Sequence, residues 1–564
     1  MNSAFGRTTD PGADGEWPSI RRRLMEDLQE RLSLFRPVLR PGLGRIVELD
    51  VPRDALRRVC RVLHQDFGFP LVSGFGADER RFAGSFAVRF VFSAQPLRFA
   101  DPRLQVAPPG TDAFVVVRSA VPEDDPQFPS ITPDIPAAHW YEREIRDMFG
   151  LTPAGHPDPR RLCLHQDWPE DIYPLRKDVD ADHRPPRADG HFHFRKVEGE
   201  GVMQVPVGPI HAGIIEPGHF RFSAVGENVL QLEARLFYTH RGVEKAAEGA
   251  SFDRGLLIAE RVCGACSFSH ASAYCQAVEI LAGLELPERA AFIRTLGIEL
   301  ERLYNHIGDV GNICAGIGLA VGVMSGAGIK ESLMQLNERI AGNRFLRGWN
   351  AIGGLKRDLD GRLIEDIGAT LARAEQDFAD LADLLLATPS YLDRVKGTGR
   401  LATEVARDLG VVGPAARASG IDADFRRDHP HLAYPSCTFE VPVYAEGDVL
   451  CRVRVRIDEA FQSFAIIRQL LSALPSGPIA LKLKPEELGA VPAHRSTFGY
   501  VESPRGSVVH YLMSGPGGVV ERYMVRSASY CNWAAVPFAV PGNIIPDFPL
   551  INKSFELCYS CLDR

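Results

Sequence analysis

Two cysteine pairs with Cys-x-x-Cys spacing constrain this chain more than any other feature of its sequence. The first pair is Cys263 and Cys266, and the second pair, Cys558 and Cys561, lies close to the last residue of the 564-residue sequence. Thiolates are soft ligands, and two such pairs offer four sulfur atoms to one metal centre. Because Cys558 follows Cys266 by 292 positions (558 − 266), the fold has to bring two distant segments together to form that centre.

Three kinds of site are compatible with these pairs. Structural zinc is the commonest metal in tetrathiolate sites, but its cysteine pairs usually lie ~15–20 residues apart. A thioredoxin-type redox pair accounts for one Cys-x-x-Cys only, and neither pair is set in a β-α-β pattern. A metal centre buried between two parts of the chain suits the wide separation, because the entropy of closing a loop grows only with the logarithm of its length.

The other cysteines lack this spacing. We expect them to be small buried apolar residues, and we expect no iron–sulfur cluster in this chain. They are Cys60, Cys163, Cys275, Cys314, Cys437, Cys451 and Cys531. An odd total of 11 cysteines that includes two Cys-x-x-Cys pairs is typical of a reducing compartment and of metal or redox thiols.

Composition and charge are those of an ordinary globular protein. Hydrophobic residues make up 45% and charged residues 24% of the sequence, which is a usual balance. A chain of this length is expected to form about two to four domains. The net charge is −8 and no long basic tract is present, which argues against nucleic-acid binding. The N-terminal residues lack the apolar segment of a secretory signal.

The N-terminal part has an α+β pattern. Residues 1–40 are expected to form a polar tail and an amphipathic helix at 20–34, and residues 41–180 an α+β domain. The elements expected in that domain are a helix within 53–67, strands at 86–93 and 113–120, and a short helix from Trp140 that Gly150 ends.

A polar segment follows this domain. Residues 181–200 are rich in Pro, Asp and His and are interpreted as a linker. Its histidines, His183, His191 and His193, are expected to be solvated, because no paired cysteine or carboxylate cluster accompanies them.

Residues 201–564 are expected to form a mainly helical domain with peripheral sheets. Helical patterns fill 270–410 and predict a helix bundle. The individual elements expected are strands at 202–215 and 220–237, helices at 287–310 and 363–386, a β-hairpin at 439–457 where valines alternate with arginines, and mixed strand and loop at 499–564.

One uncharged stretch, residues 310–329, is long enough for a transmembrane helix. However, six of its twenty residues are glycine, and the sequence on either side has mixed polarity. We therefore expect a buried, glycine-rich core helix.

Three motifs of the N-terminal part resemble a known family. They are YEREIRDMFG at 141–150, GHPDPRRL at 155–162 and PLRKD at 174–178. In this order they are similar to the small peripheral-arm subunit of respiratory complex I, the C subunit. The resemblance implies a non-catalytic α+β assembly domain.

The two cysteine pairs carry a second resemblance. The segments ERVCGACSFSH at 260–270 and CYSCLDR at 558–564 are similar to the two metal-binding motifs of NiFe-hydrogenase large subunits. EPGHFR at 216–221 resembles the N-terminal glutamate motif of that family, and ESPRG at 502–506 resembles its arginine loop. Together with the C-like domain, the segments HRGVEK, ERLYNH and FLRGWNAIGG (240–245, 301–306 and 345–354) identify the chain as similar to the complex I-related, membrane-linked group 4 hydrogenases of the formate hydrogenlyase and hydrogenase-4 type.

The resemblance implies a role for each site residue. Cys263 and Cys558 would be terminal ligands of nickel, and Cys266 and Cys561 would bridge nickel to an iron that carries cyanide and carbonyl ligands, a NiFe(CN)2CO centre. His270 would hydrogen-bond near the sulfur of Cys266. Arg505 would lie over the open metal position as a permanent positive charge. Glu216 would accept a proton from Cys558.

The activity implied is the interconversion of H2 with protons and electrons. The implied partners are an iron–sulfur small subunit, integral-membrane complex I-like subunits, and a formate dehydrogenase or ferredoxin-like electron partner. They would hold the chain at the cytoplasmic face of the membrane. Two alternatives remain open: a complex I-like subunit linked to quinone or ion transport without hydrogenase activity, and a zinc-stapled scaffold.

Two positions depart from the family pattern. Glu556 and Leu557 stand where the family usually has Asp-Pro, immediately before Cys558. Arg564 stands where many hydrogenases have histidine, so a magnesium site there is not expected.

Overall fold

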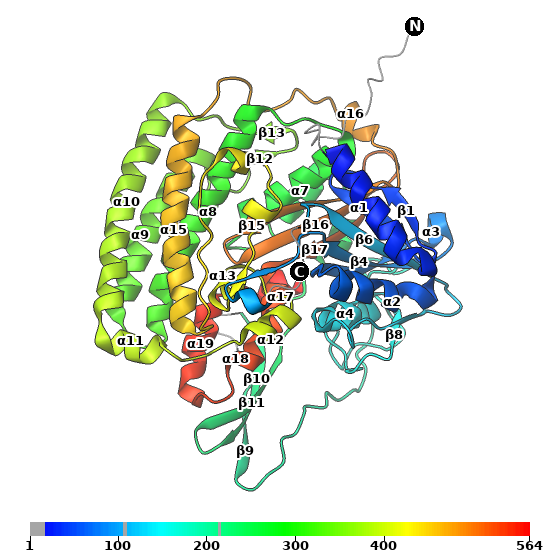
Figure 1. The fold of residues 1–564 in the computed structure, drawn as a ribbon, viewed down its shortest axis with the longest axis horizontal. Coiled ribbons are helices and arrows are strands. Elements are labelled where there is room, and N and C mark those ends of the chain that lie inside the picture. The colour runs from blue at the N-terminus through cyan, green and yellow to red at the C-terminus, as the bar shows by residue number, and fades with distance from the viewer. Residues whose placement is uncertain (1–16, 105–109, 212–215) are drawn as a thin grey trace.

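The computed structural model describes residues 17–104, 110–211 and 216–564. Figure 1 shows long helices side by side on the left, an α+β region with the N-terminal elements on the right, and a small sheet that projects from the lower end. The expected α+β class is thus confirmed. Most of the expected polar tail, residues 1–16, and the end of the strand expected at 202–215 lie outside the described residues.

A five-stranded sheet organises the N-terminal region. Its strands are β1 (Val38–Pro41), β2 (Ile46–Asp50), β3 (Leu71–Asp78), β4 (Phe86–Ser93) and β6 (Phe114–Val121). The order is β1-β2-β6-β4-β3; β2 and β6 pair in parallel and the other neighbours antiparallel. The two strands expected from the sequence are confirmed as β4 and β6. Every residue of β4 is buried, so both faces of the sheet are covered.

Four helices accompany this sheet: α1 (Trp17–Leu32), α2 (Leu56–Arg61), α3 (Arg80–Ala83) and α4 (His139–Phe149). The expected amphipathic helix is confirmed as α1, which buries Leu24, Leu28 and Leu32 along one face. The helix expected within 53–67 is α2 flanked by short 3-10 and π-helical turns. Gly150 ends α4 with a φ of 71°, a left-handed conformation that glycine adopts without strain.

The segment between the two halves of the chain is irregular. After β5 (Arg98–Phe99), β7 (Gln127–Pro129) and β8 (Thr152–Ala154), residues 155–201 contain no helix or strand. One hydrophobic core nevertheless joins the two halves, because Trp17 and Phe90 belong to the same buried cluster as Trp533 and Phe555. The domain boundaries drawn from the sequence at 40, 180 and 200 stay predictions.

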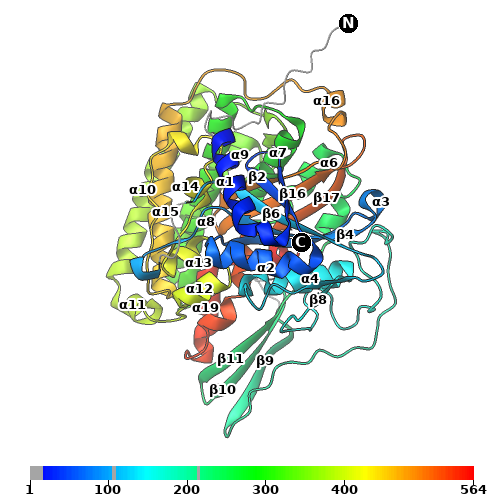
Figure 2. The same cartoon turned by 45° about the vertical axis from the view of Figure 1, so that its right-hand side comes forward.

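A three-stranded antiparallel sheet begins the second half. It consists of β9 (Val202–His211), β10 (Gly218–Val225) and β11 (Asn228–Arg235), in the order β11-β10-β9. Figures 1 and 2 both show this sheet projecting from the body of the protein. The stretch expected as a strand at 220–237 is two strands, because the chain reverses at Gly226, whose φ is 59°.

Four long helices form the bundle expected from the sequence. They are α8 (Glu288–Ala315), α9 (Ala320–Ala341), α10 (Gly361–Ala387) and α15 (Val449–Ser472). The helices expected at 287–310 and 363–386 are confirmed as α8 and α10. Short elements connect the bundle to the rest: α11 (Pro389–Val395), α12 (Thr403–Asp408), α13 (Gly413–Ala418), α14 (Phe425–Asp428), α16 (Pro485–Gly489), β12 (Asn350–Ala351), β13 (Gly354–Leu355) and β14 (Ile421–Asp422).

The glycine-rich stretch 310–329 is not the single core helix expected. It is the end of α8, a turn at Gly316 and Gly318, and the start of α9. Gly311 and Gly326 let the two helices touch backbone to backbone, because a Cβ added at Gly311 would lie 2.9 Å from the Cα of Gly326. Among the described residues, no helix is long and apolar enough to cross a membrane.

The β-hairpin expected at 439–457 is wrong, because most of its second half belongs to α15. Asp448 begins this helix, since its side chain accepts the backbone N–H of Cys451 at 2.8 Å. Two of the three arginines in that alternation, Arg452 and Arg456, are buried, and Arg452 donates to the carbonyls of Gly399 and Gly447 at 2.7 Å each. Because α15 packs against other elements on several faces, apolar and charged residues are both buried in it. The alternation of valine with arginine was therefore not the pattern of a half-exposed strand.

The end of the chain combines a sheet with short helices. β15 (Ser496–Ser503), β16 (Gly506–Ser514) and β17 (Val520–Arg526) form an antiparallel sheet. The helices that follow are α17 (Ala528–Trp533), α18 (Val536–Ala539), α19 (Phe548–Phe555) and α20 (Tyr559–Asp563). Strand and loop were expected throughout 499–564. The expectation is wrong after residue 527, because these four helices occupy most of that part. In Figure 1 the C-terminus is drawn between the bundle and the N-terminal region, and Arg564 is buried.

Candidate metal centre

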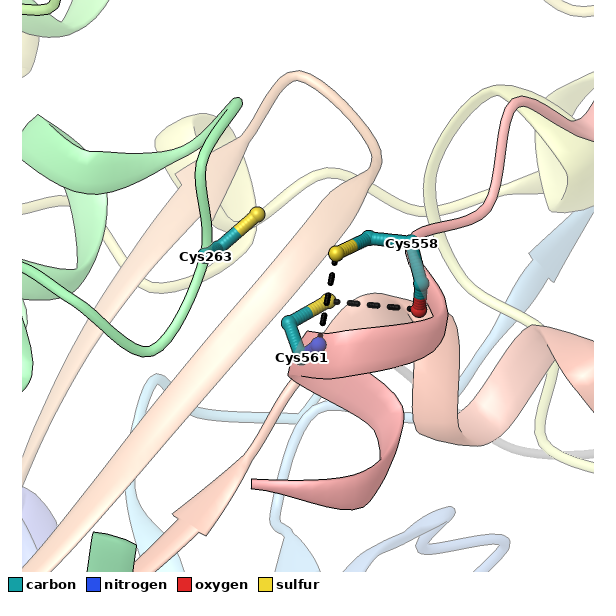
Figure 3. A group of neighbouring side chains, drawn as sticks. All are labelled: Cys263, Cys558 and Cys561. Carbon is teal, nitrogen blue, oxygen red and sulfur yellow. Dashed lines mark hydrogen bonds between the residues drawn. The ribbon is translucent and has the colours of Figure 1, made fainter. Parts of the chain in front are cut away.

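The fold brings three cysteine sulfurs together from opposite ends of the second half. Cys263 lies in the loop between α6 (Phe252–Ala259) and α7 (Ser267–Ala282), and Cys558 and Cys561 lie at the start of α20. Their Sγ atoms are all within 4.8 Å of one another. Figure 3 shows the three sulfurs turned toward one space between the loop and the helix. Cys263 and Cys561 are buried, and Cys558 is partly exposed.

The two cysteine pairs have the same local geometry. The backbone N–H of Cys266 donates to the sulfur of Cys263, and that of Cys561 donates to the sulfur of Cys558, both at 3.3 Å. The second bond is drawn in Figure 3. Each pair therefore stands at the beginning of a helix, where backbone N–H groups are free to stabilise thiolate.

The thiols are electrostatically linked. Because the thiols of Cys266, Cys558 and Cys561 donate hydrogen bonds to the sulfur of Cys263, the pKa of Cys263 lies well below its usual value. The same bond raises the pKa of Cys558 to about 12. Three cysteine sulfurs within 4.8 Å of one another match the donor set of a soft transition metal, whose ligands are thiolates. The residues present therefore fit the metal centre that the sequence predicts.

Cys266 stands beside this trio and faces Arg505. Arg505 lies in the turn between β15 and β16, and its Nη1 is 3.9 Å from the Sγ of Cys266. The buried guanidinium also donates from Nη1 to the side-chain oxygen of Asn305 at 2.8 Å and from Nε to the carbonyl of Glu556 at 2.5 Å. Arg505 thus joins both cysteine segments at the inner side of the site.

Glu216 reaches the site from the segment before β10. Its Oε2 accepts the backbone N–H of Ser560 at 2.6 Å and lies 3.9 Å from the Sγ of Cys558. The carboxylate that the sequence predicts as a proton acceptor is therefore held next to the predicted donor. Ser560 itself was not predicted; its hydroxyl lies 3.4 Å from the same sulfur.

The ring of His270 contacts a second histidine. Its Nδ1 lies 2.8 Å from the Nε2 of His510, and the Nδ1 of His510 lies 2.8 Å from the hydroxyl of Tyr523. His270 also contributes a hydrogen bond to the lowered pKa of Cys263. Burial and the neighbouring His270 hold the pKa of His510 well below its usual value. The bond expected near the sulfur of Cys266 stays a prediction.

Sequence reasoning predicted α8 but missed the polar side chains by which it supports the first cysteine pair. Glu301 on α8 accepts the backbone N–H groups of Phe268 and Ser269 at 2.7 and 2.9 Å, which fixes the start of α7. Asn305, one turn further, donates to the carbonyl of Ala265 at 2.9 Å. Asp309, a further turn along, pairs with Arg505 at 3.4 Å. The spacing of four between these three polar residues, which places them on one face of α8, was the available signal.

Burial changes the pKa of Glu301, the first of these residues. It raises the pKa of Glu301 to about 7, although the hydrogen bonds from Ser269 and Phe268 act in the opposite direction. A carboxylate at this position also interacts favourably with the positive N-terminal end of α7.

Comparison with known proteins assigns the chain to a family. Residues 49–185 match the family described as the respiratory-chain NADH dehydrogenase 30 Kd subunit, and residues 316–564 match the 49 Kd subunit of the same enzyme. Residues 241–309 match the nickel-dependent hydrogenases. The formate hydrogenlyase subunit 5 of Escherichia coli is 40% identical over 517 residues, which cover 90% of this chain and 87% of that protein. The chain belongs to the complex I-related hydrogenase large subunits.

Other relatives show how broad this family is. Hydrogenase-4 component G of Escherichia coli is 39% identical and covers 92% of this chain and 88% of that protein. Among solved structures, a chain of the membrane-bound sulfane sulfur reductase, described as an archaeal respiratory membrane complex, is 29% identical with a TM-score of 0.61. The match covers 65% of this chain and 99% of that chain. The fold is therefore shared by proteins with different named activities.

The first departure from the hydrogenase pattern has a structural consequence. Glu556 ends α19 with a left-handed φ of 50°, and this conformation aims its carbonyl at Arg505. Its carboxylate accepts from the side chain of Asn312 at 2.6 Å. Burial and the charge of Asp309 raise the pKa of Glu556 to about 7. Glu556 thus orients Arg505 through its backbone.

The second departure, Arg564, supplies a buried positive charge. Its guanidinium pairs with Glu144 on α4 and lies 3.2 Å from the carboxylate of Glu244. The ring of Tyr530 lies beneath it, with the centroid 5.0 Å from Cζ. Arg564 therefore fastens the end of α20 to the N-terminal region.

Proposed function

We propose that this chain is the catalytic subunit of a hydrogenase complex that interconverts H2 with protons and electrons. The observation that carries the proposal is the convergence of the Cys263, Cys558 and Cys561 sulfurs within 4.8 Å. Family membership alone leaves the reaction open, because a relative of similar fold is named a sulfane sulfur reductase. The converging thiols support a metal site, and the proposed hydrogen chemistry requires one.

The four cysteines would hold the metals as the sequence suggests. Cys263 and Cys558 are proposed as terminal ligands of nickel, and Cys266 and Cys561 as bridges to an iron with cyanide and carbonyl ligands. When bound, the metal pair supplies the Lewis acidity and the redox capacity for heterolytic cleavage of H2. No iron–sulfur cluster is proposed for this chain.

The protein side chains would handle the proton. Glu216 is proposed to take it from the Cys558 thiol, from which its Oε2 is 3.9 Å away. The N–H of Ser560 donates to this oxygen and holds it in place. Carboxylates and thiols are effective proton carriers when their environment brings their pKa values together.

Arg505 would supply a fixed positive charge at the reacting side of the site. Its guanidinium remains protonated at any physiological pH, so it can polarise the site without taking up the proton. Asn305, Asp309 and the carbonyl of Glu556 hold it facing Cys266. His270 is proposed to modulate the sulfur ligands through a hydrogen bond.

The proposed setting is a multisubunit complex at the cytoplasmic face of a membrane. Formate hydrogenlyase and the archaeal respiratory membrane complex among the relatives support this setting. The proposed partners are an iron–sulfur small subunit, integral-membrane complex I-like subunits, and a formate dehydrogenase or ferredoxin-like electron partner.

The test is metal and infrared analysis of the purified, matured complex. We expect one nickel and one iron per chain, infrared bands of iron-bound cyanide and carbonyl, and H2 turnover. C263S and C561S should abolish turnover, whereas C437S, which alters a cysteine outside the cluster, should leave it intact. Zinc without nickel would support a scaffold, and absence of both metals a complex I-like subunit without hydrogen chemistry. Absence of the infrared bands would falsify the proposal.

A further inference from the structure

One arginine outside the set predicted from the sequence contacts both cysteine segments. Arg241 lies just before α5 (Val243–Ala247). Its Nη1 donates to the carbonyl of Arg261 at 2.6 Å, and its Nη2 donates to the carbonyls of Val262 and Ser560 at 2.8 and 2.9 Å. The first two carbonyls immediately precede Cys263, and the third lies between Cys558 and Cys561.

The backbone around Arg241 is already attached to the second cysteine segment. The N–H of Thr239 donates to the carboxylate of Asp563 at 2.8 Å, and the ring of His240 lies 2.9 Å from the same carboxylate. The N–H of Arg241 donates to the carbonyl of Arg564 at 2.8 Å. The backbone of 239–241 is therefore fixed on the C-terminal residues, and the side chain of Arg241 is the part that reaches across to the first segment.

Arg241 and Arg505 link the same two segments at different points. Arg505 joins Cys266 to Glu556, which precedes Cys558. Arg241 joins Val262, which precedes Cys263, to Ser560, which precedes Cys561. Each cysteine pair is thus held at two points, which defines both the distance between the segments and their relative rotation.

Guanidinium chemistry suits this task. Its planar group presents N–H donors in a fixed fork, so three carbonyl oxygens held at hydrogen-bond distance have defined relative positions. A lysine ammonium carries the same charge, but it is a point donor on a flexible stem and does not impose that geometry.

We propose that Arg241 is a positioning residue that sets the separation of the two Cys-x-x-Cys segments and therefore of the sulfurs of Cys263 and Cys558. This inference rests on the proposed function, because the separation matters for a metal pair shared by the two segments. Arg241 acts through backbone carbonyls and touches none of the sulfurs in the contacts described above.

The first test measures the arrangement of sulfurs without metal. The full-length, metal-free chain is oxidised briefly with diamide, and peptides are mapped by mass spectrometry. In the wild-type chain we expect disulfides that join the 263/266 segment to the 558/561 segment. In R241A and R241Q we expect the yield of these disulfides to fall severalfold in favour of disulfides within each pair. An unchanged distribution in both variants overturns the proposal.

The second test measures the matured complex. At equal metal content per chain, R241A should shift the infrared bands of the iron ligands and lower kcat by roughly ten- to hundredfold, the usual range for small misplacement of reacting groups. The matched control is R254A, which removes an exposed arginine on α6. R241K keeps the positive charge but lacks the planar guanidinium. If lysine gave wild-type band positions and kcat, charge alone would be sufficient, and the proposed role of the guanidinium geometry would be overturned.

The two proposals fail in different ways. A wild-type complex without nickel, infrared bands and H2 turnover refutes the proposed function. A wild-type complex that has all three, together with an R241A complex indistinguishable from it in band position and kcat, refutes only the role of Arg241.

Discussion

Replacement of Gly311 by alanine tests the close contact between α8 and α9. The added Cβ would lie 2.9 Å from the Cα of Gly326 and 3.1 Å from the carbonyl oxygen of Gly322. Carbon atoms prefer separations of about 3.5–4.0 Å, so the helices must move apart by roughly 0.6–1 Å. The obstacle is backbone, so no side chain can turn away to make room.

The magnitude follows from two opposing effects. Overpacking of this kind costs about 1–3 kcal/mol, and the higher helix propensity of alanine returns up to about 1 kcal/mol. With the full return, we therefore expect G311A to weaken the α8–α9 contact by up to about 2 kcal/mol. The matched control is G328A on α9, where a Cβ would meet no atom within 4 Å. At that position only the higher helix propensity of alanine acts, and we expect G328A to stabilise α9 by up to about 1 kcal/mol.

Hydrogen exchange followed by mass spectrometry measures this difference locally. Peptides from the end of α8 and the start of α9 report the free energy of local opening, which suits a chain of this size better than a global unfolding curve. We expect faster exchange in G311A and equal or slower exchange in G328A. If the two variants exchange alike, the backbone contact does not hold these helices together and the reasoning is wrong.

The remaining predictions concern buried charge, pH and helix capping. R564M leaves the carboxylate of Glu144 without its buried partner and should loosen α20 by about 3 kcal/mol, seen as faster proteolysis near the C-terminus; adding E144Q should restore part of the loss. Burial lowers the pKa of His429 to about 4, whereas an unfolded histidine titrates near ~6.5, so the unfolded chain binds more protons between these values. The contribution of His429 to the free energy of unfolding should therefore be fully present above pH ~6.5 and fall by ~3 kcal/mol as pH drops toward 4. In urea titrations at several pH values, H429Q should reduce this fall in the free energy of unfolding, and an unchanged pH dependence would contradict the prediction. D448A removes the side-chain cap of α15 and should speed amide exchange in its first turn by an amount equivalent to about 1–2 kcal/mol, with D448N close to wild type.

Local patterns were sufficient for much of the fold. The helices α1, α8 and α10 and the strands β4 and β6 were predicted because apolar residues at helical or alternating spacing report directly which face is buried. The prediction failed where the environment was unusual. In α15, Arg452 is buried and bonded to backbone carbonyls, so a polar residue did not mark an exposed face. In the stretch 310–329, glycines serve a contact between two helices that is invisible until both are placed.

The candidate site shows the same division. Cys-x-x-Cys spacing is a local property, because it places two sulfurs at the start of one helix. It could therefore be recognised in the sequence, as could the motifs around Glu216 and Arg505. The helix α8 was predicted, but its Glu301, Asn305 and Asp309 were not recognised as supports, since four-residue polar spacing also occurs on solvated helix faces.

The sequence by itself determined which residue types are available: two pairs of thiols, a glutamate beside a Pro-Gly turn, and the arginine of the ESPRG motif. Only the tertiary structure decided that the sulfurs of Cys263 and Cys558, which are 295 positions apart along the chain (558 − 263), lie within 4.8 Å of each other, and that Arg241 spans the segments that carry them. The physical reason is that spacing within a turn is set by local backbone geometry, whereas the distance between remote segments is set by the sum of all the packing and hydrogen bonding between them.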